Sequence, residues 1–73
     1  MVKIEINTEF ITLGQFLKLS GTINTGGEAK IYLLSNIVFV NDEPENRRGK
    51  KLRQNDVVKI DNKSYLIVNK IEN

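Results

Sequence analysis

The residue types best suited to chemistry in this chain are cations, and five of them lie in one short segment. Within the seven residues from 47 to 53, the basic side chains are Arg47, Arg48, Lys50, Lys51 and Arg53. Cationic groups at this density favour binding to a polyanion, such as a string of phosphates. Three acidic residues come just before them: Asp42, Glu43 and Glu45. The alternative is therefore a solvated loop in which opposite charges pair at the surface.

A second set of candidate phosphate contacts surrounds the expected start of a helix: Thr25, Gly26, Gly27 and Lys30. The unpaired amides of a first helical turn attract anions, and glycine allows close approach to the backbone. The alternative is that Thr25 and Glu28 only cap the helix, because their spacing is that of a capping box. Both interpretations stay open at this level.

Catalysis and metal binding are disfavoured by what the sequence lacks. None of the 73 residues is histidine or cysteine, so the commonest general base, the strongest nucleophile and the commonest metal ligands are missing. The carboxylates at 42–45 are interrupted by Pro44 and do not follow a calcium-loop pattern. We therefore expect no enzyme activity, no cofactor, no metal and no small-molecule substrate.

Length and composition predict one small folded domain. The chain is 40% hydrophobic and 27% charged, which is typical of a soluble globular domain. No apolar run approaches the roughly 18 residues of a membrane span. Lys3 and Glu5 interrupt the position where a signal peptide has its apolar stretch. We expect a single domain over residues 1–73, located in the cytoplasm and without contact with a membrane.

The candidate contacts need a scaffold, and the hydrophobic pattern begins with a strand and a helix. Residues 2–6 alternate apolar and charged side chains, as a half-buried strand does. A capping box over 12–15 and a stop at Gly21 predict a helix over about 12–20. Lys18 then lies near the end of this helix, where a cation is favoured whatever the function. Its role in binding therefore stays open.

A second helix is predicted over about 26–35. Ala29 and Leu33 are spaced to face inward, and Asn36 suits a left-handed residue that ends the helix. The connection between the two helices, 21–24, is too short to let them separate. The two helices are therefore expected to pack as a pair.

The second half of the chain is predicted to be extended. The β-branched and aromatic run at 37–40 is typical of a strand covered on both faces. Apolar residues at 52–60 and 65–68 predict two more strands, joined by a tight turn at 61–63. The predicted fold is α+β, in the order β-α-α-β-β-β, with two short helices packed against a small, mostly antiparallel sheet.

These elements resemble a known family, the RNA-binding domain named after small-subunit ribosomal protein S-four, also called the alpha-L motif. The matching segments are Leu13 to Gly21, Thr25 to Lys30, Val38-Phe39-Val40-Asn41 and Asn55-Asp56-Val57-Val58. The resemblance covers about residues 11–60, which would be the core of the domain. Residues 25–30 together with 40–49 are similar, more specifically, to the small stand-alone bacterial YaaA-type members.

The resemblance implies non-catalytic binding of structured RNA, either ribosomal RNA or a ribosome-associated RNA, with the ribosome or its subunits as partner. The contacts would come from the face of the helix pair and from the basic loop. Where the broader family often carries arginine, this chain has Thr12 and Gly26. The implied RNA-contacting charge therefore falls on Lys18, Lys30 and the segment 47–53.

Two other functions stay open. One is duplex DNA binding through the helix at 26–35, although its one cation is Lys30 and it lacks the Arg, Asn or Gln side chains that read base edges. The other is a protein-interaction module whose basic loop meets an acidic partner. Phe16 and Phe39 lie on apolar periodicities, so we expect both in the core and no platform for stacking unpaired bases. The oligomeric state is not set by the sequence.

Overall fold

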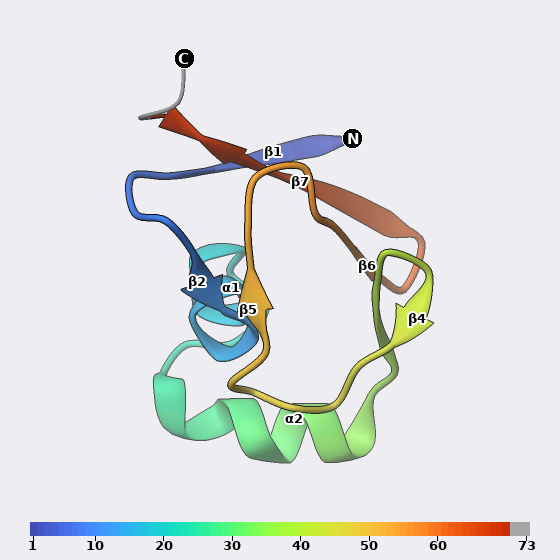
Figure 1. The fold of residues 1–73 in the computed structure, drawn as a ribbon. Helices are drawn as coiled ribbons and strands as arrows, with labels where there is room; N and C mark the ends of the chain where they lie inside the picture. The colour runs from blue at the N-terminus through green and yellow to red at the C-terminus, as the bar shows by residue number, and fades with distance from the viewer. Residues whose placement is uncertain (71–73) are drawn as a thin grey trace.

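The fold is a twisted sheet with two short helices beneath it, in a computed structural model that describes residues 1–70 (Figure 1). The helices are α1 (Leu13–Leu19) and α2 (Ala29–Ser35), the latter preceded by a 3₁₀ turn, η1 (Gly26–Glu28). The strands are β1 (Val2–Ile6), β2 (Ile11–Thr12), β3 (Val38–Val40), β4 (Glu43–Pro44), β5 (Lys51–Leu52), β6 (Val57–Ile60) and β7 (Lys63–Asn69). The predicted α+β class is confirmed, and β2, β4 and β5 are short additions to the predicted order.

Five strands form the main sheet in the order β1-β7-β6-β3-β4. β1 runs parallel to β7, with Val2 opposite Tyr65, and the other neighbouring pairs are antiparallel. β2 and β5 form a separate antiparallel ribbon beside α1 (Figure 1). The segment 47–53 is therefore not one loop, because Lys51 and Leu52 within it form β5.

The core lies between the sheet and the two helices. Phe16 and Leu17 of α1 are fully buried, and the Phe16 ring meets the Tyr65 ring edge-on, with centroids 5.2 Å apart. The prediction that Phe16 lies in the core is confirmed. Phe39 is only half-buried and Ile37 is 69% exposed, so the expectation of a strand covered on both faces was wrong. The helices cover one face of the sheet and leave the alternate residues of β3 partly open.

Local signals define both ends of α1, as predicted. The Thr12 hydroxyl accepts from the Gln15 amide, and the Gln15 side chain accepts from the Thr12 amide. At the other end, Gly21 has a φ of +79°. The amides of Gly21 and Thr22 donate to the carbonyls of Lys18 and Leu17, which is the Schellman arrangement.

Together, η1 and α2 span the range predicted for the second helix, 26–35, but the contacts at both of its ends differ from those predicted. Thr25 makes no side-chain hydrogen bond to a backbone amide, so the second capping box was wrong. The Glu28 amide instead donates to the Thr25 carbonyl, and this bond closes the 3₁₀ turn. At the C-terminus, Asn36 has an extended φ of −135° rather than a left-handed one. Both its amide and its side-chain nitrogen donate to the Tyr32 carbonyl.

Asn41 and Asp56, two residues of the family motif, connect β3 to β6. Asn41 and Asp42, at φ of 51° and 69°, form the tight turn between β3 and β4. The Asn41 side chain donates to Asp56 Oδ1 at 3.0 Å and accepts from the Val57 amide at 2.9 Å. The other Asp56 oxygen accepts from the Arg53 amide. Asn41 and Asp56 therefore have a structural role, which is to join the end of β3 to the start of β6.

Candidate nucleic-acid interface

Three segments that are distant in sequence line one surface depression of about 460 Å³. The first segment is α1 with its cap, and it contributes Thr12, Gly14, Gln15 and Lys18. The second, η1 with the start of α2, contributes Gly26 and Ala29. The third is the turn after β4, which contributes Arg48 and Gly49. We call this surface the helix-pair depression. It brings together Lys18, Gly26 and Arg48, three of the site residues expected from the sequence.

Backbone hydrogen bonds dock the turn at 47–50 onto the start of α1. The Leu13 amide donates to the Lys50 carbonyl at 2.8 Å, and the Gly14 amide donates to the Arg48 carbonyl at 2.9 Å. These bonds satisfy amides that a first helical turn otherwise leaves without an acceptor. The start of α1 therefore has no free amides to offer an anion, and the docked turn holds Arg48 next to the helix pair.

Small residues form the floor of the helix-pair depression. A Cβ atom on Gly14 would lie 3.4 Å from the Arg48 carbonyl oxygen and 3.5 Å from the Ala29 Cβ. α1, α2 and the turn thus approach each other closely at this point. The depression is open to solvent, which suits the backbone of a large ligand better than an enclosed small molecule.

Charge on the helix-pair depression comes from Lys18 and Arg48, whose residues are both exposed. Lys18 lies in the last turn of α1. Among residues 1–70, no carboxylate lines the depression. Two cations around an open surface without a competing acid can neutralise phosphate oxygens.

The two glycines expected to contact phosphate lie in different places. Gly26 lines the helix-pair depression and Gly27 does not, although both are exposed in η1. A Cβ on Gly26 would have no heavy atom within 4 Å, and neither glycine has a positive φ. No steric or conformational need of the fold therefore requires glycine at position 26. Lys30 is exposed at the start of α2, directly after Ala29, and does not line the depression.

Arg47 is already engaged by a carboxylate. Its Nε and Nη2 atoms donate to the two oxygens of Glu45 at 2.9 and 3.0 Å. The hydrogen bonds from the Arg47 side chain lower the pKa of Glu45 to about 2, against an ordinary value of 4.5. The same contact raises the pKa of Arg47. The opposite-charge pairing that the sequence left open therefore occurs between Glu45 and Arg47, and it reduces the charge that Arg47 can offer to a ligand.

Lys51 and Arg53 form a second basic surface around an aromatic ring. The Lys51 ammonium lies 4.8 Å from the centre of the Phe10 ring, and the Arg53 guanidinium carbon lies 5.3 Å from it. Both distances are within the range of a cation–π interaction. Sequence reasoning missed Phe10 because no periodicity links it to residues 51–53. Only the pairing of β2 with β5 brings them together.

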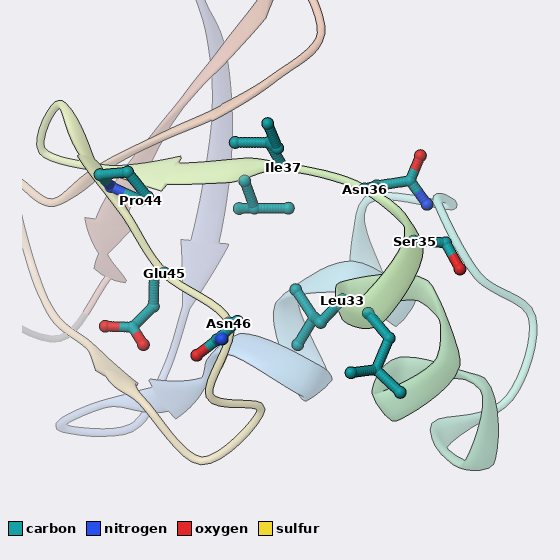
Figure 2. A pocket seen from close by; sticks show the side chains of 9 residues that line it. Leu33, Ser35, Asn36, Ile37, Pro44, Glu45 and Asn46 are labelled. Atoms are coloured by element: carbon teal, nitrogen blue, oxygen red, sulfur yellow. The ribbon is translucent and has the colours of Figure 1, made fainter.

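A second depression, of about 360 Å³, lies at the end of α2. Figure 2 shows Glu45 and Asn46 on one wall and Leu33 on the facing helix. Leu34, Ile37 and Pro44 add apolar surface to it, and none of the described lysines or arginines lines it. This groove is therefore not a continuation of the helix-pair depression.

Comparison with known proteins identifies the family. The model of the S4 domain matches residues 4–68, a range that includes the helix-pair depression and the whole basic segment 47–53. The chain belongs to the S4 domain family. The resemblance to the S-four type of RNA-binding domain is thereby confirmed. A protein of Bacillus subtilis (strain 168) named "Probable ribosome maturation protein RlbA" is 57% identical over 67 residues, which cover 90% of this chain and 94% of that protein.

Within residues 1–70, the S4 domain shows neither a membrane-spanning helix nor a metal-binding cluster. Among residues 1–70, no helix is long and apolar enough to cross a membrane. Within the same residues, no three side chains of the His, Cys, Asp or Glu types are grouped so that they could hold a metal ion.

Sequence reasoning did not assign Thr12, Gly14, Gln15 and Gly49 to the site. The capping pattern at 12–15 pointed to this position, but only as the start of a helix.

Proposed function

We propose that this protein is a non-catalytic RNA-binding protein that docks on structured RNA through the helix-pair depression. One observation carries the proposal: Lys18, Gly26 and Arg48 come from three separate segments and converge on one open surface. In the part of the chain that the structure describes, no carboxylate lines this surface. Convergent cations beside exposed backbone suit the phosphates of a folded RNA. Membership of the S4 domain family supports the same class of ligand.

In this proposal each residue has a distinct role. Lys18 and Arg48 neutralise phosphates at the depression, and Gly26 lets the RNA backbone approach the start of η1. Lys50, Lys51 and Arg53 extend the basic surface along the turn and β5, while Lys30 adds charge at the start of α2. Thr25 and Gly27 flank Gly26 and shape this part of the backbone. Arg47 contributes least, because Glu45 holds it.

The RNA partner we propose is ribosomal RNA or an RNA of the assembling ribosome. The name of the Bacillus subtilis relative refers to ribosome maturation, and that relative is matched over nearly its whole length. Because ribosomes assemble in the cytoplasm of bacteria, the cytoplasm is the location that goes with this proposal. Binding itself, without bond-making chemistry, is the whole activity in this proposal.

Filter binding with fragments of ribosomal RNA tests the proposal. With about five cations in contact, the logarithm of affinity should fall against the logarithm of salt concentration with a slope of roughly −3 to −5. Replacing both Lys18 and Arg48 with glutamine should make the slope shallower by about two and weaken binding at every salt concentration tested. A slope near zero for the unmodified protein would contradict the electrostatic mechanism.

The matched control removes the same charge elsewhere. Lys59 and Lys63 lie on the β6–β7 hairpin and do not line the helix-pair depression. Their double replacement with glutamine should leave most of the affinity intact. Equal losses from both double variants would show that net charge, and not the depression, determines binding. A DNA duplex of the same length serves as competitor, and equal affinity for it would favour the DNA-binding alternative.

A further inference from the structure

The main sheet has two edges, and only one of them contains a proline. At one edge, β4 is two residues long and contains Pro44, which cannot donate a hydrogen bond to a further strand. At the other edge, β1 is five residues long and contains no proline. It pairs with β7 on one side, and within residues 1–70 no strand pairs with its outer side. The outer edge of β1 is therefore able to accept another strand.

The sequence of β1 is complementary to itself when one copy is reversed. In an antiparallel pair centred on Ile4, Lys3 lies opposite Glu5 of the second copy, and Val2 lies opposite Ile6 of the second copy. Lys3 and Glu5 are exposed and lie two residues apart, so they share one face of the strand. From this charge complementarity we propose that β1 pairs antiparallel with β1 of a second copy and joins two sheets into one.

Exposed apolar side chains lie where this pairing would cover them. A depression of about 280 Å³ at the end of β1 is lined by Glu5, Ile6, Ile11 and the 60%-exposed Leu19, among others. Residues directly opposite each other in a pair point to the same face of the sheet. The antiparallel pairing thereby places Val2 of the second copy, which lies opposite Ile6, at this depression. Met1 of the second copy lies beyond it. Met1, Val2 and Leu19 are three of the six large apolar side chains exposed within residues 1–70.

The charges also select the direction of pairing. Charged residues on an edge strand normally discourage association, and a parallel, in-register pair would place like charges side by side. The antiparallel pair has two Lys–Glu contacts and closes on itself, because its two-fold axis uses up both free edges. Five residues per copy bury less than the roughly 1,200 Å² of a standard interface, so the dimer is weak.

Sedimentation equilibrium of the full chain without RNA tests this proposal. Over protein concentrations from about 10 μM to 1 mM, the apparent mass should rise from 8.3 kDa toward twice that value. Lys3→Glu alone and Glu5→Lys alone should each weaken association by at least about tenfold, because each brings like charges together twice. An equimolar mixture of the two variants, and the double exchange in one chain, should both restore association. A monomer at every concentration, or association unaffected by Lys3→Glu, would overturn the proposal.

A second pair of variants keeps the test independent of the charges. Leu19→Lys introduces a charge in the depression beside β1 and should abolish association. Leu34→Lys, at a 76%-exposed position on α2, should leave association unchanged. Loss of association in the Leu34 variant alone would overturn the proposal by placing the interface on α2. Because no RNA is present, these outcomes are separate from those that test the RNA-binding proposal.

Discussion

Replacing Gly26 with alanine should change stability and RNA binding in opposite directions. Gly26 is exposed at the first position of η1, its φ is not positive, and a Cβ there would have no neighbour within 4 Å. The fold therefore has room for the methyl group. If the depression receives an RNA backbone, however, the same methyl group occupies space that a phosphate needs.

The stability gain follows from the entropy of the unfolded chain. Glycine loses more conformational freedom on folding than alanine does, so a compatible Gly→Ala replacement stabilises a protein by about 0.4–1 kcal/mol. For a domain of this size, that corresponds to a rise in Tm of about 2 to 8 °C. Differential scanning calorimetry of the Gly26→Ala variant measures this change directly.

The expected loss in binding comes from one disrupted contact. A hydrogen bond to a charged phosphate contributes about 1.5–3 kcal/mol, so its loss should lower RNA affinity roughly ten- to a hundredfold. Gly27→Ala is the matched control, because Gly27 is also exposed in η1 but does not line the depression. It should raise Tm by a similar amount and leave RNA affinity near that of the unmodified protein.

The two variants together can refute the reasoning. If Gly26→Ala binds RNA as well as the unmodified protein in filter binding, the depression is not where the RNA backbone lies. If Gly26→Ala lowers Tm, the backbone at η1 is not as open as described. A similar loss of affinity in both variants would mean that flexibility of η1, and not space at Gly26, is what binding requires.

Two further predictions concern Glu45 and the two threonines that precede the helices. Glu45→Gln should raise RNA affinity several-fold in filter binding, because it frees Arg47 and removes a negative charge; unchanged affinity would place Arg47 outside the RNA surface. The pKa of Glu45 is lowered in the folded protein, so its contribution to stability is present above pH 4.5 and is lost as pH falls toward about 2. Urea midpoints of the unmodified protein and Glu45→Gln should accordingly differ at neutral pH and converge in that range. Thr12→Ala should cost about 1 kcal/mol through loss of the cap on α1. Thr25→Ala should cost less than about 0.5 kcal/mol, since its hydroxyl caps no amide; equal costs would contradict the assigned helix starts.

The parts of the fold that sequence reasoning predicted correctly are those fixed by neighbouring residues. Both ends of α1 depend on contacts within five residues, from Thr12 to Gln15 and from Leu17 to Thr22. A local pattern contains all the information needed for such a contact. The prediction of a capping box at the start of the second helix was wrong for a related reason. Two side chains can satisfy the same amides in more than one way, and at Glu28 a backbone carbonyl took the place of the Thr25 hydroxyl.

The division of the basic segment could not be predicted, because it depends on pairings between distant residues. A two-residue strand such as β5 has no periodicity to detect, and its position is set by pairing with Ile11 and Thr12. That pairing turns Lys51 and Arg53 toward Phe10 and leaves Arg48 with the helix pair. Composition gave the sign of the charge, and the sheet pairing decided where each cation lies.

Backbone hydrogen bonds position Arg48 at the helix-pair depression. They explain how two cations can lie there without their repulsion destabilising the fold. Its carbonyl, and that of Lys50, accept hydrogen bonds from the first amides of α1. These amides need acceptors in any folded state, so the docking of the turn depends on the backbone and not on the arginine side chain. The Arg48 residue is exposed, as is Lys18, so solvent screens their mutual repulsion. The backbone thus holds two like charges at one depression, and a phosphate that binds there adds an attraction that the free protein lacks.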